Sequence, residues 1–158
     1  MVGLLYPLAV KATADHHTDA RRFGSNRASG RKHAGIDLYA PAGTSVRAMC
    51  DGRVLRVYPF YCETYAIEID HGNFIARYGE IDKRKSNIFV QAGDQVKRGE
   101  QIGVVGRLIG IKVPSNMLHL EMYASTGDSP LTIKDNPPYQ RRKDLIDPTP
   151  SIDAAVME

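Results

Sequence analysis

The sequence predicts an all-β fold, a compact antiparallel β-sandwich, on three observations. From Gly35 onwards, short runs that alternate apolar and polar residues are separated by Gly, Pro, Asn and Asp, which is typical of strands joined by turns. The segment 70–73 (DHGN) is a turn sequence that joins two of these runs into a hairpin. The segment 42–47 (AGTSVR) recurs as 92–97 (AGDQVK), and two similar hairpin units packed as a sandwich would explain this repeat.

The alternating runs give the expected strands in chain order. The segment 106–116, which contains Gly110 and Pro114, is expected to be a loop beside the last of them. The expected strands are residues 36–39, 45–49, 52–58, 64–70, 73–78, 101–105 and 117–123.

The length of 158 residues fits one domain with a sizeable core. Residues 1–22 are expected to form an N-terminal segment that lies over the domain, and residues 23–125 to form the domain itself. Residues 126–158 are rich in Ser, Gly, Asp and Pro, so we expect an irregular C-terminal extension packed on the domain or trailing it. Its last residues, 151–158, are expected to be frayed.

Composition excludes several classes of protein. The net charge of +3 is mildly basic, and the basic runs 83–85 and 141–143 are short, so we interpret them as solvated loops and expect no nucleic-acid partner. No apolar run approaches the ~20 residues that span a bilayer. The first ten residues lack a basic leader and a cleavage site, so no signal peptide is expected. Two cysteines, Cys50 and Cys62, are too few for a disulfide framework or a cysteine-type zinc site. Whether they form one disulfide bond with each other stays an open question.

Residues 116–122 (NMLHLEM) are the most informative stretch of the chain. Leu118 and Leu120 alternate with Met117, His119 and Glu121, which predicts a strand with the leucines on an apolar core. The other three side chains then share the opposite face. Glu121 is placed to orient a metal ligand on that face through a hydrogen bond.

A second candidate segment lies far upstream, where His33 and Asp37 are four residues apart. The glycines around them argue against a helix, and a regular strand would separate the two by about 13 Å. A bend at Gly35 would bring both side chains to one point. Together with His119 they make a set of two histidines and one carboxylate, which suits zinc and leaves a fourth position for water or substrate.

These segments belong to a longer ordered set of motifs. The set spans about residues 20 to 125 and resembles the M23 (lysostaphin-type, LytM-like) zinc metallopeptidases, many of which cut peptide bridges in bacterial cell walls. The matching residues are Phe23-Gly24, Arg27, His33-x-x-x-Asp37, Ala40-Pro41-x-Gly43, Asp51-Gly52-x-Val54, Tyr78, Gly93-Asp94-x-Val96-Lys97-x-Gly99 and Leu118-His119-Leu120-Glu121.

The resemblance implies a compact antiparallel β structure with a metal-binding groove. It also implies that His33, Asp37 and His119 hold Zn²⁺ and that the partner is a peptidoglycan peptide. Bound zinc would lower the pKa of a water molecule and polarise the carbonyl of the bond to be cut.

Two positions depart from the family pattern. The histidine usually found two residues before the last ligand is Met117, and the histidine usually found two residues after the tyrosine is Glu80. In the family these histidines position the attacking water and stabilise the tetrahedral intermediate. A methionine thioether is a poor hydrogen-bond partner and cannot shuttle protons.

A carboxylate is a usable replacement, and Glu80 is our candidate general base. The alternative is a surface glutamate beside the charged turn at 82–85. Tyr78 and Glu80 are two residues apart, so on a regular strand their side chains would share a face. Tyr78 is therefore a candidate to donate a hydrogen bond from its hydroxyl to an oxyanion, and the alternative is a packing role. His16 and His17 are interpreted as a surface pair, because adjacent side chains on extended backbone point apart.

The sequence therefore predicts a zinc-dependent endopeptidase that cleaves peptide bonds in bacterial peptidoglycan. The alternative is a catalytically inactive zinc-binding module that binds a wall peptide or a protein partner, and a purely structural domain without zinc is the third hypothesis. Because no signal peptide is seen, delivery to the wall by a phage or a specialised secretion route is expected.

Overall fold

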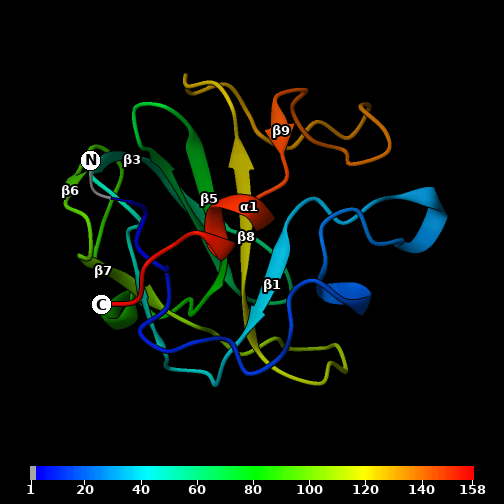
Figure 1. Cartoon of the computed structure of the whole chain (residues 1–158), viewed down its shortest axis with the longest axis horizontal. Helices are drawn as coiled ribbons and strands as arrows, with labels where there is room; N and C mark the ends of the chain where they lie inside the picture. The colour runs from blue at the N-terminus through cyan, green and yellow to red at the C-terminus, as the bar shows by residue number, and fades with distance from the viewer. Residues whose placement is uncertain (1–2) are drawn as a thin grey trace.

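The computed structural model describes residues 3–158, and antiparallel strands make up most of its regular structure (Figure 1). A short α-helix and three 3-10 helices complete it: α1 (Thr149–Asp153), η1 (Asp19–Arg21), η2 (Ala28–Gly30) and η3 (Lys85–Asn87). None of the helices in the described residues has the length and apolar character needed to cross a bilayer. The strands are β1 (Ile36–Tyr39), β2 (Ser45–Arg47), β3 (Gly52–Pro59), β4 (Tyr65–Asp70), β5 (Ile75–Ile81), β6 (Gln95–Val96), β7 (Gln101–Val104), β8 (Met117–Tyr123) and β9 (Leu145–Ile146).

Most of the strands belong to one sheet. Its order is β1-β8-β5-β4-β3-β6, with β9 paired to β8, while β2 and β7 form a separate two-stranded sheet. Every pairing between these strands is antiparallel, so the predicted all-β antiparallel fold is confirmed. The expected bounds of β1 and β8 agree with the structure. Strands β6 and β9 were not predicted, because two residues are too few to show an alternation.

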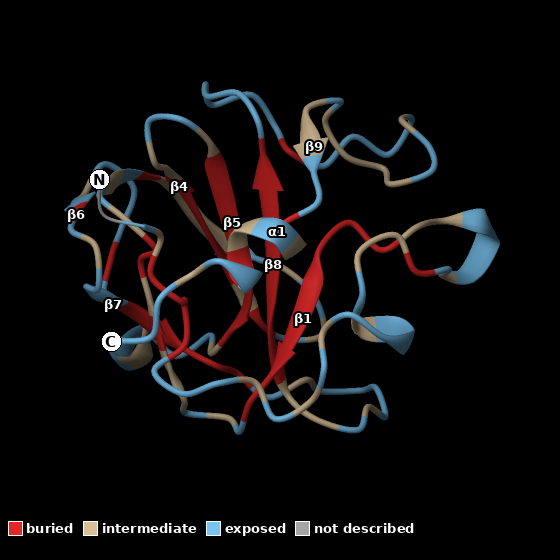
Figure 2. Ribbon diagram, in the orientation of Figure 1, coloured by how far each residue is buried: buried red, intermediate tan, exposed pale blue. Residues whose placement is uncertain are grey.

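The core lies against one face of the large sheet. Figure 2 shows that buried residues run along β1, β5 and β8. In β8, Leu118 and Leu120 point into this core, as the alternation predicts, and Leu8 joins them from the N-terminal segment. The two-stranded sheet contributes Val46 and Ile102. Burial of these side chains at about 25 cal/mol per Å² supplies the main favourable term for folding.

The last residues of the chain are bound, so the prediction that residues 151–158 are frayed is wrong. Ile152 is buried in the core, and Val156 pairs with Leu5 near the other end of the chain. The Arg98 guanidinium lies 2.8 Å from a carboxylate oxygen of Glu158. These contacts hold the last residues against the N-terminal segment and the domain.

Cys50 and Cys62 are both free thiols, which answers the open question of a bridge between them.

Tyr78 lies in the core, so the expectation that it shares a face with Glu80 is wrong. It pairs with Leu120 across β5 and β8, and its side chain is fully buried among the apolar residues. Its hydroxyl accepts the backbone N–H of Met49 at 3.1 Å. It also lies 2.8 Å from Nε2 of His71, whose Nδ1 donates to a backbone carbonyl, so the hydroxyl donates to Nε2.

Replacing Tyr78 with Phe should lower the free energy of unfolding by about 1–3 kcal/mol, because the buried N–H of Met49 loses its acceptor. Urea unfolding measures this change, and Tyr65→Phe, at a half-buried ring, is the matched control. Metal content should stay at the wild-type level. A Tyr78→Phe variant with wild-type stability would contradict the structural role.

Candidate metal centre

Three neighbouring strands set the metal candidates in one row. Asp37 on β1 lies opposite His119 on β8, and Gly79 on β5 lies opposite His119 from the other side. Because side chains alternate along a strand, this row lies on the face of the sheet away from Leu118 and Leu120. The polar face predicted for β8 therefore exists, and it is covered, since His119 is only 6% exposed.

His33 reaches this row because the chain bends before β1. The strand begins at Ile36, so His33 lies outside it, as the sequence predicts. A Cβ atom at Gly35 would lie 2.2 Å from the carbonyl oxygen of Leu120, a distance that no side chain tolerates. Glycine at this position lets the backbone press against β8 and turn His33 towards Asp37.

The three expected ligands converge. Nε2 of His33 lies 3.1 Å from Oδ1 of Asp37 and 3.3 Å from Nδ1 of His119, and that Nδ1 lies 3.0 Å from the same carboxylate oxygen. Tetrahedral zinc with bonds of about 2.0–2.2 Å holds its donor atoms about 3.3–3.5 Å apart. The donor set and its spacing therefore fit a zinc ion with only small movements.

Each imidazole has its other nitrogen occupied by an acceptor. Nδ1 of His33 donates to the carbonyl of Arg22 at 2.8 Å, and Nε2 of His119 donates to Oε2 of Glu121 at 2.7 Å. These bonds orient both rings, so that Nε2 of His33 and Nδ1 of His119 face Asp37 and can bind a metal once they carry no proton.

Burial and the neighbouring charges shape the titration of this cluster. Burial lowers the pKa of His33. Burial alone would also lower the pKa of His119, but its hydrogen bonds to Asp37 and Glu121 outweigh this and raise the pKa to about 9. Burial opposes ionisation of Asp37, yet hydrogen bonds from the two histidines hold its pKa below the ordinary value. A cation entering the site therefore displaces a proton from His119.

Glu121 supports His119 from a buried ionic network. It is fully buried, and Arg77 donates to its Oε1 from Nη2 at 2.8 Å and from Nε at 3.1 Å. Arg141 of the C-terminal extension donates to both of its oxygens, and the hydroxyl of Tyr123 donates to Oε1. The sequence predicts the contribution of Glu121 but not that of the two arginines. The signal for Arg77 is a charged residue inside an otherwise apolar strand run, whereas Arg141 has no local signal.

The sequence profile described as "Peptidase family M23" matches residues 31–131. This chain belongs to peptidase family M23. The match begins two residues before His33 and includes Asp37 and His119, so it covers the whole converging donor set.

Known proteins agree with this assignment. Peptidoglycan DD-endopeptidase ShyA of Vibrio cholerae is 33% identical over 120 residues, which are 74% of this chain and 26% of that protein. The solved structure of LytU matches with a TM-score of 0.64 at 26% identity and covers 91% of this chain and 92% of that one. The solution structure of lysostaphin matches with a TM-score of 0.62 at 20% identity. The match covers 87% of this chain and 50% of lysostaphin. The expected lysostaphin-like fold is confirmed. The chain spans only 16% to 27% of the length of the curated relatives it matches.

Glu80 stands where M23 peptidases usually have a histidine, and the structure buries it. The register of β4 and β5 shifts between Tyr65 and Ile67, which places a bulge at Gly79 and Glu80. Glu80 adopts a φ of 66°, a conformation that costs a non-glycine residue about 1–3 kcal/mol. The bulge breaks the strand parity, which explains why Glu80 and Tyr78 do not share a face.

Glu80 is only 6% exposed, so its interpretation as a surface glutamate is wrong. Its Oε2 atom is buried without a hydrogen-bond partner among the described residues. Burial raises the pKa of Glu80 to about 8, and the nearby charges of His119 and Asp37 act on it in opposite directions. A cation held by the donor set would lower that pKa again towards neutrality.

Met117 and Phe60 cover the same face with apolar groups. Met117 is 5% exposed, yet it is not among the residues of the apolar core, as expected for the face that carries His119. The ring of Phe60 lies 5.8 Å from that of His119, and a Cβ atom at Gly79 would meet it at 2.7 Å. Sequence reasoning missed Phe60, which lies in the connection after β3.

We expect the buried carboxyl of Glu80 to make the metal-free protein less stable as pH rises. Because its pKa is raised from 4.5 to about 8, the folded state keeps a proton that the unfolded state releases. This stabilising contribution is complete below pH 4.5 and is lost as pH rises to about 8. Urea unfolding across this range, with a chelator present, should therefore show a smaller loss of stability for Glu80→Gln than for wild type. Parallel pH profiles would contradict this expectation.

Proposed function

We propose that this chain is a zinc-dependent endopeptidase that cleaves peptide bonds in bacterial peptidoglycan. One observation carries the proposal: the donor atoms of His33, Asp37 and His119 converge, and the charges of His119 and Asp37 act on the buried carboxyl of Glu80, one oxygen of which has no hydrogen-bond partner among the described residues. Membership of family M23 supports a peptidase, and the similarity to the peptidoglycan DD-endopeptidase ShyA supports a wall substrate.

Zinc is the cation that this donor set favours. Two imidazoles and one carboxylate are a ligand set of catalytic zinc sites, whereas Mg²⁺ and Ca²⁺ prefer oxygen ligands alone. When bound, zinc supplies Lewis acidity that activates a water molecule and polarises a peptide carbonyl. The occupied outer nitrogens of His33 and His119 keep both rings aimed at the site.

Glu80 supplies the proton transfer in this proposal. Its carboxylate accepts a proton from the attacking water and returns it to the leaving amine, as a general base and then a general acid. An oxygen without a partner is available for that proton, and a pKa that burial raises and a cation lowers suits transfer in both directions. The backbone at φ 66° is strained, and such strain persists only where the surrounding structure holds the residue in its conformation.

A binding module without turnover is the second candidate, and Met117 favours it. Its thioether lies on the site face where the family usually has a histidine, and it cannot donate a hydrogen bond to an oxyanion. In that case the centre would hold zinc and a wall peptide but would not cut the peptide.

Replacing Glu80 with Gln should strongly slow hydrolysis and leave metal binding intact. The amide keeps the size of the side chain but cannot accept the proton, so turbidity loss of purified peptidoglycan should slow by about 10²–10⁴-fold. Zinc per chain, measured by mass spectrometry of the metal, should equal that of wild type.

Glu63→Gln is the matched control, because that glutamate has an exposed side chain paired with Lys83. It should keep both zinc and activity. An active Glu80→Gln variant would remove the general-base role from Glu80. Zinc-loaded wild type that leaves peptidoglycan intact would instead support the binding module.

A further inference from the structure

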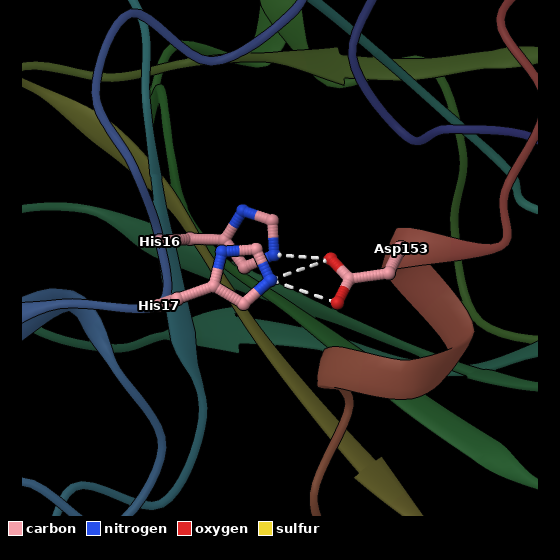
Figure 3. A group of neighbouring side chains, drawn as sticks. All are labelled: His16, His17 and Asp153. Atoms are coloured by element: carbon pink, nitrogen blue, oxygen red, sulfur yellow. Dashed lines mark hydrogen bonds and ion pairs between the residues drawn. The ribbon is translucent and has the colours of Figure 1, made fainter.

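A second cluster of metal-ligating side chains joins the two ends of the chain. Nε2 of His16 lies 2.9 Å from Oδ1 of Asp153, and Nε2 of His17 lies 2.9 Å from Oδ1 and 2.8 Å from Oδ2 of that carboxylate. Figure 3 shows both rings directed at Asp153, which projects from α1. No residue of this cluster belongs to the centre around His33.

The backbone at the two histidines explains this convergence and corrects the sequence interpretation. His16 and His17 lie in a turn, whereas the expectation that their side chains point apart assumed extended backbone. Their rings stack with centroids 4.1 Å apart and an interplanar angle of 30°. Adjacent histidines can therefore present two nitrogens to the same point.

A further carboxylate holds one of the rings in the orientation that a metal ligand needs. Nδ1 of His17 donates to Oδ1 of Asp15 at 2.6 Å, which leaves Nε2 facing Asp153. The same arrangement orients His119 through Glu121 in the other centre. A carboxylate behind a ligating histidine fixes its tautomer and raises its basicity.

We propose that His16, His17 and Asp153 form a second binding site, for a divalent transition-metal cation such as Zn²⁺. Imidazole nitrogens select such cations over Mg²⁺ and Ca²⁺. The two histidine nitrogens lie 2.8–2.9 Å from the Asp153 oxygens, and the three donor atoms all lie within 4.8 Å of one another, so small movements bring them to the spacing of about 3.3–3.5 Å that surrounds a zinc ion.

The surroundings leave room for the remaining coordination. The side chain of His16 is 13% exposed, while those of His17 and Asp153 are 47% and 44% exposed. All three residues line a groove of about 540 Å³, through which water can reach the site and complete the tetrahedron. The partial exposure also allows the cation to enter without opening the core.

Metal at this site would cross-link segments that are far apart in sequence. His16 and Asp153 are separated by 137 residues. Leu5 and Val156 already form a bridge between the first and last parts of the described chain. A cation that binds only the folded state would stabilise this closure by an amount that grows with the logarithm of the cation concentration relative to its Kd.

The test compares zinc binding by the intact chain and by the double variant His16→Ala/His17→Ala, using equilibrium dialysis with Zn²⁺. The double variant should bind one zinc fewer per chain than wild type, whatever the centre around His33 holds. Asp153→Asn, which keeps the shape of the side chain, should show the same loss. Equal zinc content in wild type and both variants would overturn the proposal and leave the cluster as an ion pair only.

A positioning role for Asp15 gives a second readout. Asp15→Asn should weaken zinc binding at this site by about 10–100-fold, because His17 loses its charged partner. Asp19→Asn is the matched control in the same segment, since the Asp19 side chain is 82% exposed and outside the cluster, and it should bind like wild type. An equal effect of the two substitutions would contradict the role of Asp15.

Discussion

The antiparallel pairing of β1 with β8 is the constraint on which the site depends. Its register puts Asp37 opposite His119, and the close approach of Gly35 to the Leu120 carbonyl turns His33 into the same space. A shift of one residue would move His119 to the apolar face and Leu118 to the polar one. The core and the metal centre therefore lie on opposite faces of the same pair of strands. Burial of the leucines on one face fixes the register, and the register fixes the positions of the ligands on the other face.

The second consequence of this arrangement is a sheet face that is both charged and buried. Isolated buried charges are costly, and most of those on this face have partners: Glu121 is held by Arg77 and Arg141, and the donor triad is hydrogen-bonded among itself. Glu80 differs from them: burial raises its pKa to about 8, one of its oxygens has no partner among the described residues, and its backbone is strained. Such uncompensated features concentrate at functional sites, because the surrounding structure supports them.

Local patterns in the sequence predicted the regular strands with their alternating side chains. They did not predict features that depend on a single irregular position. The alternation around His119 gave β8 and its polar face, and the glycine beside His33 gave the bend. The bulge at Gly79 and Glu80 leaves no periodic trace, so the parity argument misplaced Tyr78. The partners Arg141 and Phe60 lie far away or in loops, and contacts of that kind are decided by tertiary packing. The turn at His16 and His17, in which the Asp15 carboxylate accepts the backbone N–H of His17, was missed because the prediction assumed extended backbone there.

The most direct test of this account is a crystal structure of the zinc-loaded protein with anomalous scattering measured at the zinc edge. We expect a peak between His33, Asp37 and His119, with each of the three donor atoms at about 2.0–2.2 Å from it. A fully loaded protein with no anomalous peak among these residues would contradict the metal centre, and with it the proposed hydrolysis.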